Sequence, residues 1–427
     1  MARQTLAQVY FNRRMLVLLG LGFASGLPSA YKLLGDTVAA WLTDLDYDVK
    51  TIGLFSLVGL PFTFNFVWAP LLDRFVPPLL GRRRGWLLII QMLLICAIAA
   101  MAFAGPVQRD QSLMVFALAA LVVAWLAASQ DVVADAYRTD VLPTAERGAG
   151  AACYVNGYRI AMLAAGGGAI LLSDILPWRV VYLLLAAMMV IGILTTLIAP
   201  RPSGESETPQ NITDAVINPI SDFFRRYGGM GLTILLFVVL FKLPDALANK
   251  MVMPLLQKHL QFTKPQIVLV REWLGLAATV IGAFAGGAIS ARWSLRRSLL
   301  LFGVLQASSN AGYCVLAMTG TSVTVLTGVV VIENFSAGLV TTGFIAFLMS
   351  LCNRRYSATQ YALFTSLSFF TASAAGALTG FAVEAVGYIW FYALTVAAGV
   401  PGMVLLIWIR IGDSTGSTLA ATGKSSS

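Results

Sequence analysis

Five ionisable residues stand near the middle of long apolar stretches of this chain: Lys32, Arg159, Lys242, Asp245 and Glu333. A charge at bilayer depth costs roughly 2.5–3.5 kcal/mol on insertion scales, so such a residue is expected to face a bundle interior or a water-filled cavity. Because the set holds three cations and two carboxylates, it predicts a site for an anionic ligand. Two more cations lie toward the outer end of the same stretches: Lys250 and Arg271.

Each central charge also has a purely structural interpretation. Lys32 and Asp36 are four residues apart and share a helix face, so they either neutralise each other or form a ligand-facing lysine tuned by its neighbour. Glu333 is a candidate proton carrier, since a carboxyl group away from water can exist in its neutral form. The alternative is a Glu333 locked to Lys242 or Arg159.

A second acidic pair, Asp131 and Asp135, shares one face of its apolar stretch. Like charges at this spacing repel unless a base or a proton intervenes. One interpretation is a protonation site in a cavity wall. The other is a gate on the inner side, where these acids meet Arg82–Arg84 or Arg138 and separate on opening.

Aromatic residues near these charges are a further class of candidate. They could stack on a sugar ring or serve only in packing: Tyr154, Tyr158, Trp273, Tyr313 and Phe335. Most tryptophans instead stand near the ends of apolar segments, which is typical of interfacial belts.

Motifs of catalysis, of phosphate loops and of metal sites are absent from the sequence. There is no G-x-x-x-x-G-K-[ST], H-E-x-x-H or G-x-S-x-G string. His259 is the single histidine, and the four cysteines fall in apolar segments without metal-type or paired spacing. We therefore expect no enzyme activity, no cofactor, no metal and no nucleotide hydrolysis within this chain.

The elements that must position these residues are membrane-spanning helices. The chain is 58% hydrophobic and 11% charged, with a mean hydropathy of +0.80, outside the range of soluble globular proteins. A spanning helix needs roughly 20 apolar residues. The expected fold is all-α with twelve transmembrane helices, near 15–42, 50–72, 86–105, 112–136, 150–173, 178–199, 229–257, 265–290, 298–319, 323–351, 360–385 and 388–409.

Most arginines and lysines outside these helices fall in alternate connections, on the side that carries the N-terminus. This bias predicts that both termini are cytoplasmic. It also explains the net charge of +9 without a nucleic acid partner.

Residues 200–228 interrupt the helical pattern and divide the chain into halves. We expect a six-helix bundle over 1–199, a cytoplasmic linker with an amphipathic helix over 200–228, a second bundle over 229–410 and a disordered tail over 411–427. Pro28 and Pro244 are as far apart as Arg138 and Arg354, which suggests two homologous halves that rock around a midplane site.

Several strings resemble a known transporter family. Asp73-Arg74 and Gly81-Arg82-Arg83-Arg84-Gly85 resemble the D-R-x-G-R-R signature of the major facilitator superfamily, with Phe75–Leu80 inserted. This longer form resembles the AmpG-type muropeptide permeases, as do the run from Leu21 to Pro28, ASQDVVADAYRTDVLPTAERGAGAA from Ala128 and LCNRRYSATQYAL from Leu351. The resemblance covers the chain from about residue 13 to 405.

The resemblance implies a proton-driven importer in the bacterial inner membrane. Its cargo would be N-acetylglucosaminyl-1,6-anhydro-N-acetylmuramyl peptides, moved from periplasm to cytoplasm for peptidoglycan recycling and linked to β-lactamase induction. It also marks Gly26, Gln130, Asp131 and Asp135 as functionally sensitive. The alternatives are a carrier of another large anion such as acetyl-CoA, or a membrane sensor or enzyme that binds wall-derived ligands without moving them.

The sequence thus predicts a monomer that binds a small-molecule substrate, protons and membrane lipid. Its predicted substrate-binding residues are Lys32, Arg159, Lys242, Asp245, Glu333, Gln130 and Tyr158. Its predicted proton-coupling residues are Asp131, Asp135, Glu333 and Asp36, with Asp245 as a further candidate. Its predicted gating residues, expected to latch one conformation with a counterpart near Arg292–Arg297, are Asp73, Arg74, Arg82, Arg83, Arg84 and Arg138.

Overall fold

A computed structural model describes residues 12–47, 51, 55–106, 113–202 and 212–409. The predicted tail over 411–427 and the middle of the predicted linker lie outside these residues. The described residues form helices joined by short connections, with no strand among them. The prediction of an all-α membrane fold is confirmed.

The first half of the chain runs to Ile198. Its helices are α2 (Arg13–Gly26), η1 (Lys32–Thr37), α3 (Val38–Asp44), η2 (Phe55–Gly59), α5 (Leu60–Phe64), η3 (Asn65–Val67), α6 (Ala69–Arg74), α7 (Arg82–Ala104), α8 (Leu113–Val141), η4 (Thr144–Glu146), α9 (Arg147–Leu163), η5 (Ala164–Gly168), α10 (Ala169–Ser173), α11 (Trp178–Met188) and α12 (Val190–Ile198). The linker helix α13 (Ile212–Tyr227) follows.

The second half begins at Met230. Its helices are α14 (Met230–Pro254), η6 (Leu255–His259), α15 (Lys264–Ile267), η7 (Val268–Leu274), α16 (Gly275–Arg292), α17 (Leu295–Thr319), α18 (Val323–Leu351), η8 (Arg354–Tyr356) and α19 (Ser357–Trp408). Gly387, at φ 76°, kinks α19 where two spans were predicted. A positive φ is easily adopted only by glycine, which explains why the turn falls there.

Nine helices in the described part of the chain are long and apolar enough to cross a membrane. The other three predicted spans fall on helices that are broken into short pieces or joined end to end. Pro28 stands between α2 and η1, and Pro61 and Pro70 stand near the starts of α5 and α6. Proline lacks the backbone N–H that continues a helix, which explains why the structure departs here from the continuous helices expected over 15–42 and 50–72.

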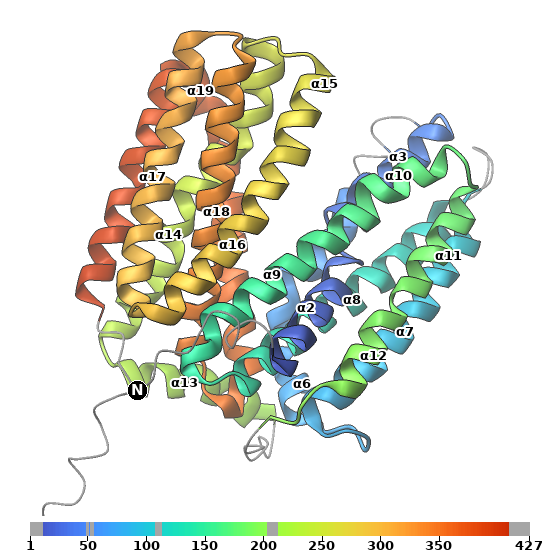
Figure 1. Ribbon diagram of the computed structural model, residues 1–427. Helices are drawn as coiled ribbons and strands as arrows, with labels where there is room; N and C mark the ends of the chain where they lie inside the picture. Colours follow the sequence, from blue (N-terminus) through green and yellow to red (C-terminus); the bar gives the residue numbers. More distant parts are fainter. Residues whose placement is uncertain (1–11, 48–50, 52–54, 107–112, 203–211, 410–427) are drawn as a thin grey trace, which may run out of the picture.

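The two halves converge at the end where α13 lies and diverge toward the end that carries α3, α10 and α15 (Figure 1). Contacts between the halves run from α9 to α16 and α18, and from α6 and α8 to α19. The connection between the halves is therefore concentrated on a few helices.

Within each half, one helix pair is in backbone contact because glycines line the seam. In the first half, a Cβ on Gly157 would lie 1.9 Å from the carbonyl oxygen of Leu19, and one on Gly22 would lie 2.0 Å from that of Tyr154. In the second half, Gly282 and Gly338 bring α16 and α18 together in the same way. Small residues commonly allow such close packing in membranes.

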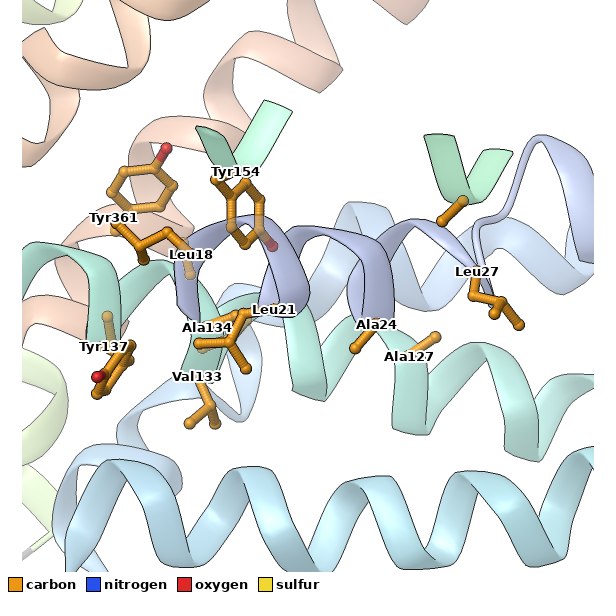
Figure 2. Packing of buried hydrophobic residues seen from close by; sticks show 14 of the residues in the cluster. Leu18, Leu21, Ala24, Leu27, Ala127, Val133, Ala134, Tyr137, Tyr154 and Tyr361 are labelled. Carbon is orange, nitrogen blue, oxygen red and sulfur yellow. The ribbon is translucent and has the colours of Figure 1, made fainter. Parts of the chain in front are cut away.

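Apolar side chains fill the space around the first seam. Figure 2 shows the side chains of α2 packed beside those of α8, with tyrosines from α9 and α19 near one end of the group. The labelled members are Leu18, Leu21, Ala24, Leu27, Ala127, Val133, Ala134, Tyr137, Tyr154 and Tyr361.

Candidate functional site

Lys32 and Asp36 form an ion pair on η1, with 2.7 Å between Lys32 Nζ and Asp36 Oδ2. The π-helical turn starts at Lys32, just after the chain leaves α2 at Pro28. Both side chains keep some exposure, so water screens the pair. In this conformation Asp36 therefore neutralises Lys32, which agrees with the interpretation that the two side chains form an internal pair.

A second local pair joins Lys242 and Asp245 on α14, with 3.2 Å between Lys242 Nζ and Asp245 Oδ2. Gln306 Nε2 donates to the other carboxylate oxygen at 3.2 Å, and Asn249 Nδ2 donates to it at 3.0 Å. The Asp245 carboxylate is therefore held by one cation and two amides.

Glu333 lies 4% exposed in the middle of α18. Its Oε2 accepts a hydrogen bond from Asn334 Nδ2 at 2.8 Å and one from the Tyr313 hydroxyl at 3.5 Å. Among the residues described, no lysine or arginine lies within 4.0 Å of it. The structure therefore does not show Glu333 locked to Lys242 or Arg159.

Charges from the two halves nevertheless meet around Glu333. Arg159, on α9, is attracted to both Glu333 and Asp245. Arg271, on η7, is attracted to Glu333 and to the Tyr313 hydroxyl. Four of the five predicted central charges, those of Arg159, Lys242, Asp245 and Glu333, thus belong to one electrostatic cluster, while Lys32 is paired with Asp36. Arg271, which the sequence placed only toward the outer end of its stretch, also acts on this cluster.

Asp135 is paired across one helical turn, with 2.7 Å between its Oδ1 and Nη2 of Arg138. The same Nη2 donates to the hydroxyl of Tyr361 at 2.6 Å, which joins α8 to α19 in the other half. The Arg138 guanidinium also lies 4.3 Å from the ring centre of Tyr154. Asp135 therefore belongs to a contact between the halves, as the gate interpretation expects.

Asp131 has different surroundings, although it lies only one turn away. It interacts electrostatically with Ser25 and with the hydroxyls of Tyr154 and Tyr158. Its Oδ1 is buried without a hydrogen-bond partner, and no ion pair to it is found among the described residues. Gln130 lies beside it and donates from Nε2 to Ser25 Oγ at 3.4 Å.

A buried polar link between the halves is centred on Asp73, at the end of α6. Arg83 Nη2 donates to its Oδ1 at 2.7 Å, while the backbone N–H and the hydroxyl of Thr359 both donate to its Oδ2 at 2.8 Å. Arg83 also pairs with Asp140 at 2.8 Å and donates to Ser357 Oγ at 2.6 Å. Asp73 and Arg83 are almost fully buried, so this network has little competition from water.

The other predicted gating residues divide into two groups. Arg82 donates to the carbonyl of Asp73 and to that of Arg354 in the second half, at 3.1 and 3.4 Å. Arg84 instead donates to the carbonyls of Thr196 and Leu197 in its own half. Arg74 lies 5.2 Å from the ring centre of its neighbour Phe75. In the second half, Arg296 donates to the carbonyl of Ile407.

The linker helix α13 is attached to the start of α19. Asp222 pairs with Arg226 at 2.8 Å and accepts from Gln360 Nε2 at 3.1 Å and from Asn353 Nδ2 at 3.2 Å. Arg226 Nη2 also donates to the carbonyl of Leu351 at 3.0 Å. These polar contacts tie α13 to the second half, while it also packs against α6 of the first half.

Some of these contacts could not be found from the sequence. Asp140 follows the quoted Arg138 by two residues and was not singled out; Thr359 and Tyr361 belong to common residue types and gave no signal. Within the described ranges, no three His, Cys, Asp or Glu side chains gather in a way that could hold a metal ion.

Comparisons with known proteins identify the fold and the family. Residues 37–377 match the model of the Major Facilitator Superfamily. The anhydromuropeptide permease of Escherichia coli K12 is 46% identical over 404 residues, which cover 94% of this chain and 81% of the permease.

Two solved structures share the fold at low sequence identity. The human organic anion transporter MFSD10 superposes with a TM-score of 0.70 at 16% identity, covering 92% of this chain and 99% of that one. The transporter FucP in its outward conformation gives 0.69 at 13% identity, covering 94% and 99%. Matched over most of its length by a family of carriers and by a permease, this chain is a multi-pass membrane transporter that belongs to the major facilitator superfamily.

Proposed function

We propose that this protein imports anhydromuropeptides, N-acetylglucosaminyl-1,6-anhydro-N-acetylmuramic acid and its peptides, across the bacterial inner membrane for peptidoglycan recycling. The observation that carries the proposal is the 46% identity, over 94% of the chain, to a protein named anhydromuropeptide permease. The cluster of cations around Glu333 supports it, because the peptide part of such a molecule carries free carboxylates. The proposed driving force is the proton gradient.

The proposed orientation places α13 and both termini in the cytoplasm. The end of the molecule at α13 carries the cationic residues Arg225, Arg226 and Arg82–Arg84, and cytoplasmic connections of membrane proteins are rich in such residues. In this orientation, the network of Asp73 and Arg83 closes the cytoplasmic side. The halves 1–199 and 229–410 are proposed to rock about the central cluster, with 200–228 as their linker.

The proposed proton carriers are Asp131 and Glu333, since no ion pair to either is found in the described part of the chain. Asp36 and Asp135 each hold a cation at 2.7 Å and are less suited to exchange a proton. For the substrate, we propose contacts with Arg159, Lys32, Lys242, Gln130 and Tyr158. Lys32 and Lys242 would have to exchange their aspartate partners for a ligand carboxylate.

Uptake of radiolabelled anhydromuropeptide into proteoliposomes of the purified protein tests the function. We expect accumulation above the external concentration when the outside is acidic, and only equilibration when the pH is equal on both sides. Absence of saturable uptake under any gradient would end the transport proposal and favour a sensor. Equilibration that ignores the gradient would end the symport proposal, and stronger uptake of acetyl-CoA would assign the alternative cargo.

A further inference from the structure

Two half-buried arginines, Arg159 and Arg271, differ from the ion-paired cations of the two halves. Arg83 and Arg138 each form an ion pair at 2.8 Å or less, and Lys32 and Lys242 pair with nearby aspartates. For Arg159 and Arg271, no carboxylate lies within 4.0 Å among the residues described. Nη1 of Arg271 is in addition buried without a hydrogen-bond partner.

A guanidinium that loses part of its water without gaining a counter-charge is destabilised, and a buried N–H without a partner adds to the cost. Buried polar groups in folded proteins nearly always have a partner, so an exception requires an explanation. In a carrier, the missing partner of the guanidinium can be an anionic group of the cargo, which is present only while the cargo is bound.

The position of the two arginines agrees with a ligand held between the halves. Arg159 comes from α9 in the first half, and Arg271 from η7 in the second. Both are attracted to Glu333 on α18, and α9 packs against α18. η7 packs against α18 as well, so the two arginines stand on helices that contact the helix of Glu333, one from each half.

Glu333 does not satisfy either arginine in this conformation. Its hydrogen bonds come from the neutral donors of Asn334 and Tyr313. The charged groups that act on it are Arg159, Arg271 and Asp245, and Asp245 is itself paired with Lys242. When all five groups are charged, the cluster holds three cations and two carboxylates: Arg159, Arg271, Lys242, Asp245 and Glu333. It therefore needs one more negative charge to be neutral.

We infer that Arg159 and Arg271 together hold a carboxylate of the transported molecule, and that Glu333, while it is ionised, is the counter-charge that limits how tightly this carboxylate binds. A guanidinium presents parallel N–H donors that match a carboxylate, and two of them from opposite halves would tie the halves to the ligand. The inference rests on the proposed function and specifies which chemical group of the cargo is recognised, with Arg271 as a new binding residue.

The test compares two forms of one cargo in proteoliposomes. One is the labelled anhydromuramyl tripeptide disaccharide, and the other is the same molecule with its peptide carboxyls converted to carboxamides. We expect the wild type to prefer the carboxylate form, and Arg271→Gln to raise its KM about 10- to 100-fold, the loss typical of a hydrogen bond to a charged group. The KM of the amidated form should stay unchanged, so the preference disappears.

Two further variants sharpen the result. Glu333→Gln removes the competing negative charge and is expected to lower the KM for the carboxylate form, measured at equal pH on both sides. Lys250→Gln is the matched control, since Lys250 is an exposed cation on α14; it should preserve both KM values and the preference.

The outcomes separate the inference from the function. Suppose that the wild type takes up both forms and that Arg271→Gln keeps the same preference for the carboxylate form. This result would overturn the carboxylate site and leave the transport proposal intact. Absence of uptake by the wild type would overturn both. If Arg271→Gln does not purify as a folded protein, Arg271→Lys answers the same question. Lysine keeps the positive charge but lacks the parallel N–H donors of the guanidinium, so this variant should lose most of the preference for the carboxylate form.

Discussion

Arg83→Gln is expected to open the end of the molecule at which α13 lies. Without the guanidinium, Asp73 and Asp140 stay buried without their cation, and removal of one partner of a buried pair costs about 3–5 kcal/mol. Separation of the halves would let water reach Asp73, so the equilibrium should shift toward the open form by about 100-fold or more. Transport that requires closure at this end should fall accordingly.

Labelling of a cysteine at the interface between the halves measures this shift. Ser290 is suitable, because its Oγ is buried and a Cβ on Gly148 would lie 2.6 Å from Ser290 Cβ. In a chain whose four native cysteines are replaced, Ser290→Cys should react slowly with maleimide, and much faster once Arg83→Gln is added. Arg225→Gln, at a side chain that is 82% exposed, should not change the rate.

A charge-free version of the network distinguishes a latch from a general loss of stability. Asp73→Asn, Arg83→Gln and Asp140→Asn together remove both ion pairs without leaving either carboxylate buried without its cation, and such replacements are often neutral for stability. We expect this triple variant to fold and to label more slowly than Arg83→Gln alone. Equal labelling of Arg83→Gln and the parent would show that Asp73 and Arg83 do not control closure.

Asp131→Asn is expected to abolish proton-driven accumulation while preserving exchange of substrate across the membrane. Asparagine has the shape of a protonated aspartate but cannot release a proton, so the carrier would move cargo without coupling. For one proton per substrate, a gradient of two pH units supports an accumulation of up to about 100-fold. That ratio should fall to about 1 in the variant, as the coupling free energy is lost.

The measurement uses vesicles whose membrane potential is held at zero with valinomycin and equal potassium. Net accumulation is compared with counterflow, in which internal unlabelled substrate drives entry of labelled substrate. Asp174→Asn serves as control, because Asp174 is an exposed acid at the end of α10. Retained accumulation in Asp131→Asn would assign proton coupling to another acid, with Glu333 as the next candidate.

Much of the fold follows from the sequence alone. The lengths of the apolar segments predict the spans, but the expected continuous helices over 15–42 and 50–72 are broken into shorter ones in the structure. The two predicted spans near 360–385 and 388–409 correspond to the two parts of α19, which meet at the non-helical Gly387.

The candidate site was predictable where its contacts are local. The pairs of Lys32 with Asp36 and of Lys242 with Asp245 lie within one helical turn and follow from spacing. The pairing of Arg83 with Asp140, and the approach of Arg271 to Glu333, join distant helices. A single sequence holds no distance information for such contacts, and Arg271 was accordingly placed only near the outer end.

The glycine seams have a mechanical consequence for a carrier of this kind. Where α2 meets α9, and α16 meets α18, no side chains lie between the backbones at Gly157 and Gly282 to change rotamer and absorb a shear. Each half is therefore expected to move as a rigid body, with little internal deformation. The free-energy changes of the transport cycle must then fall mainly on the few polar contacts between the two halves.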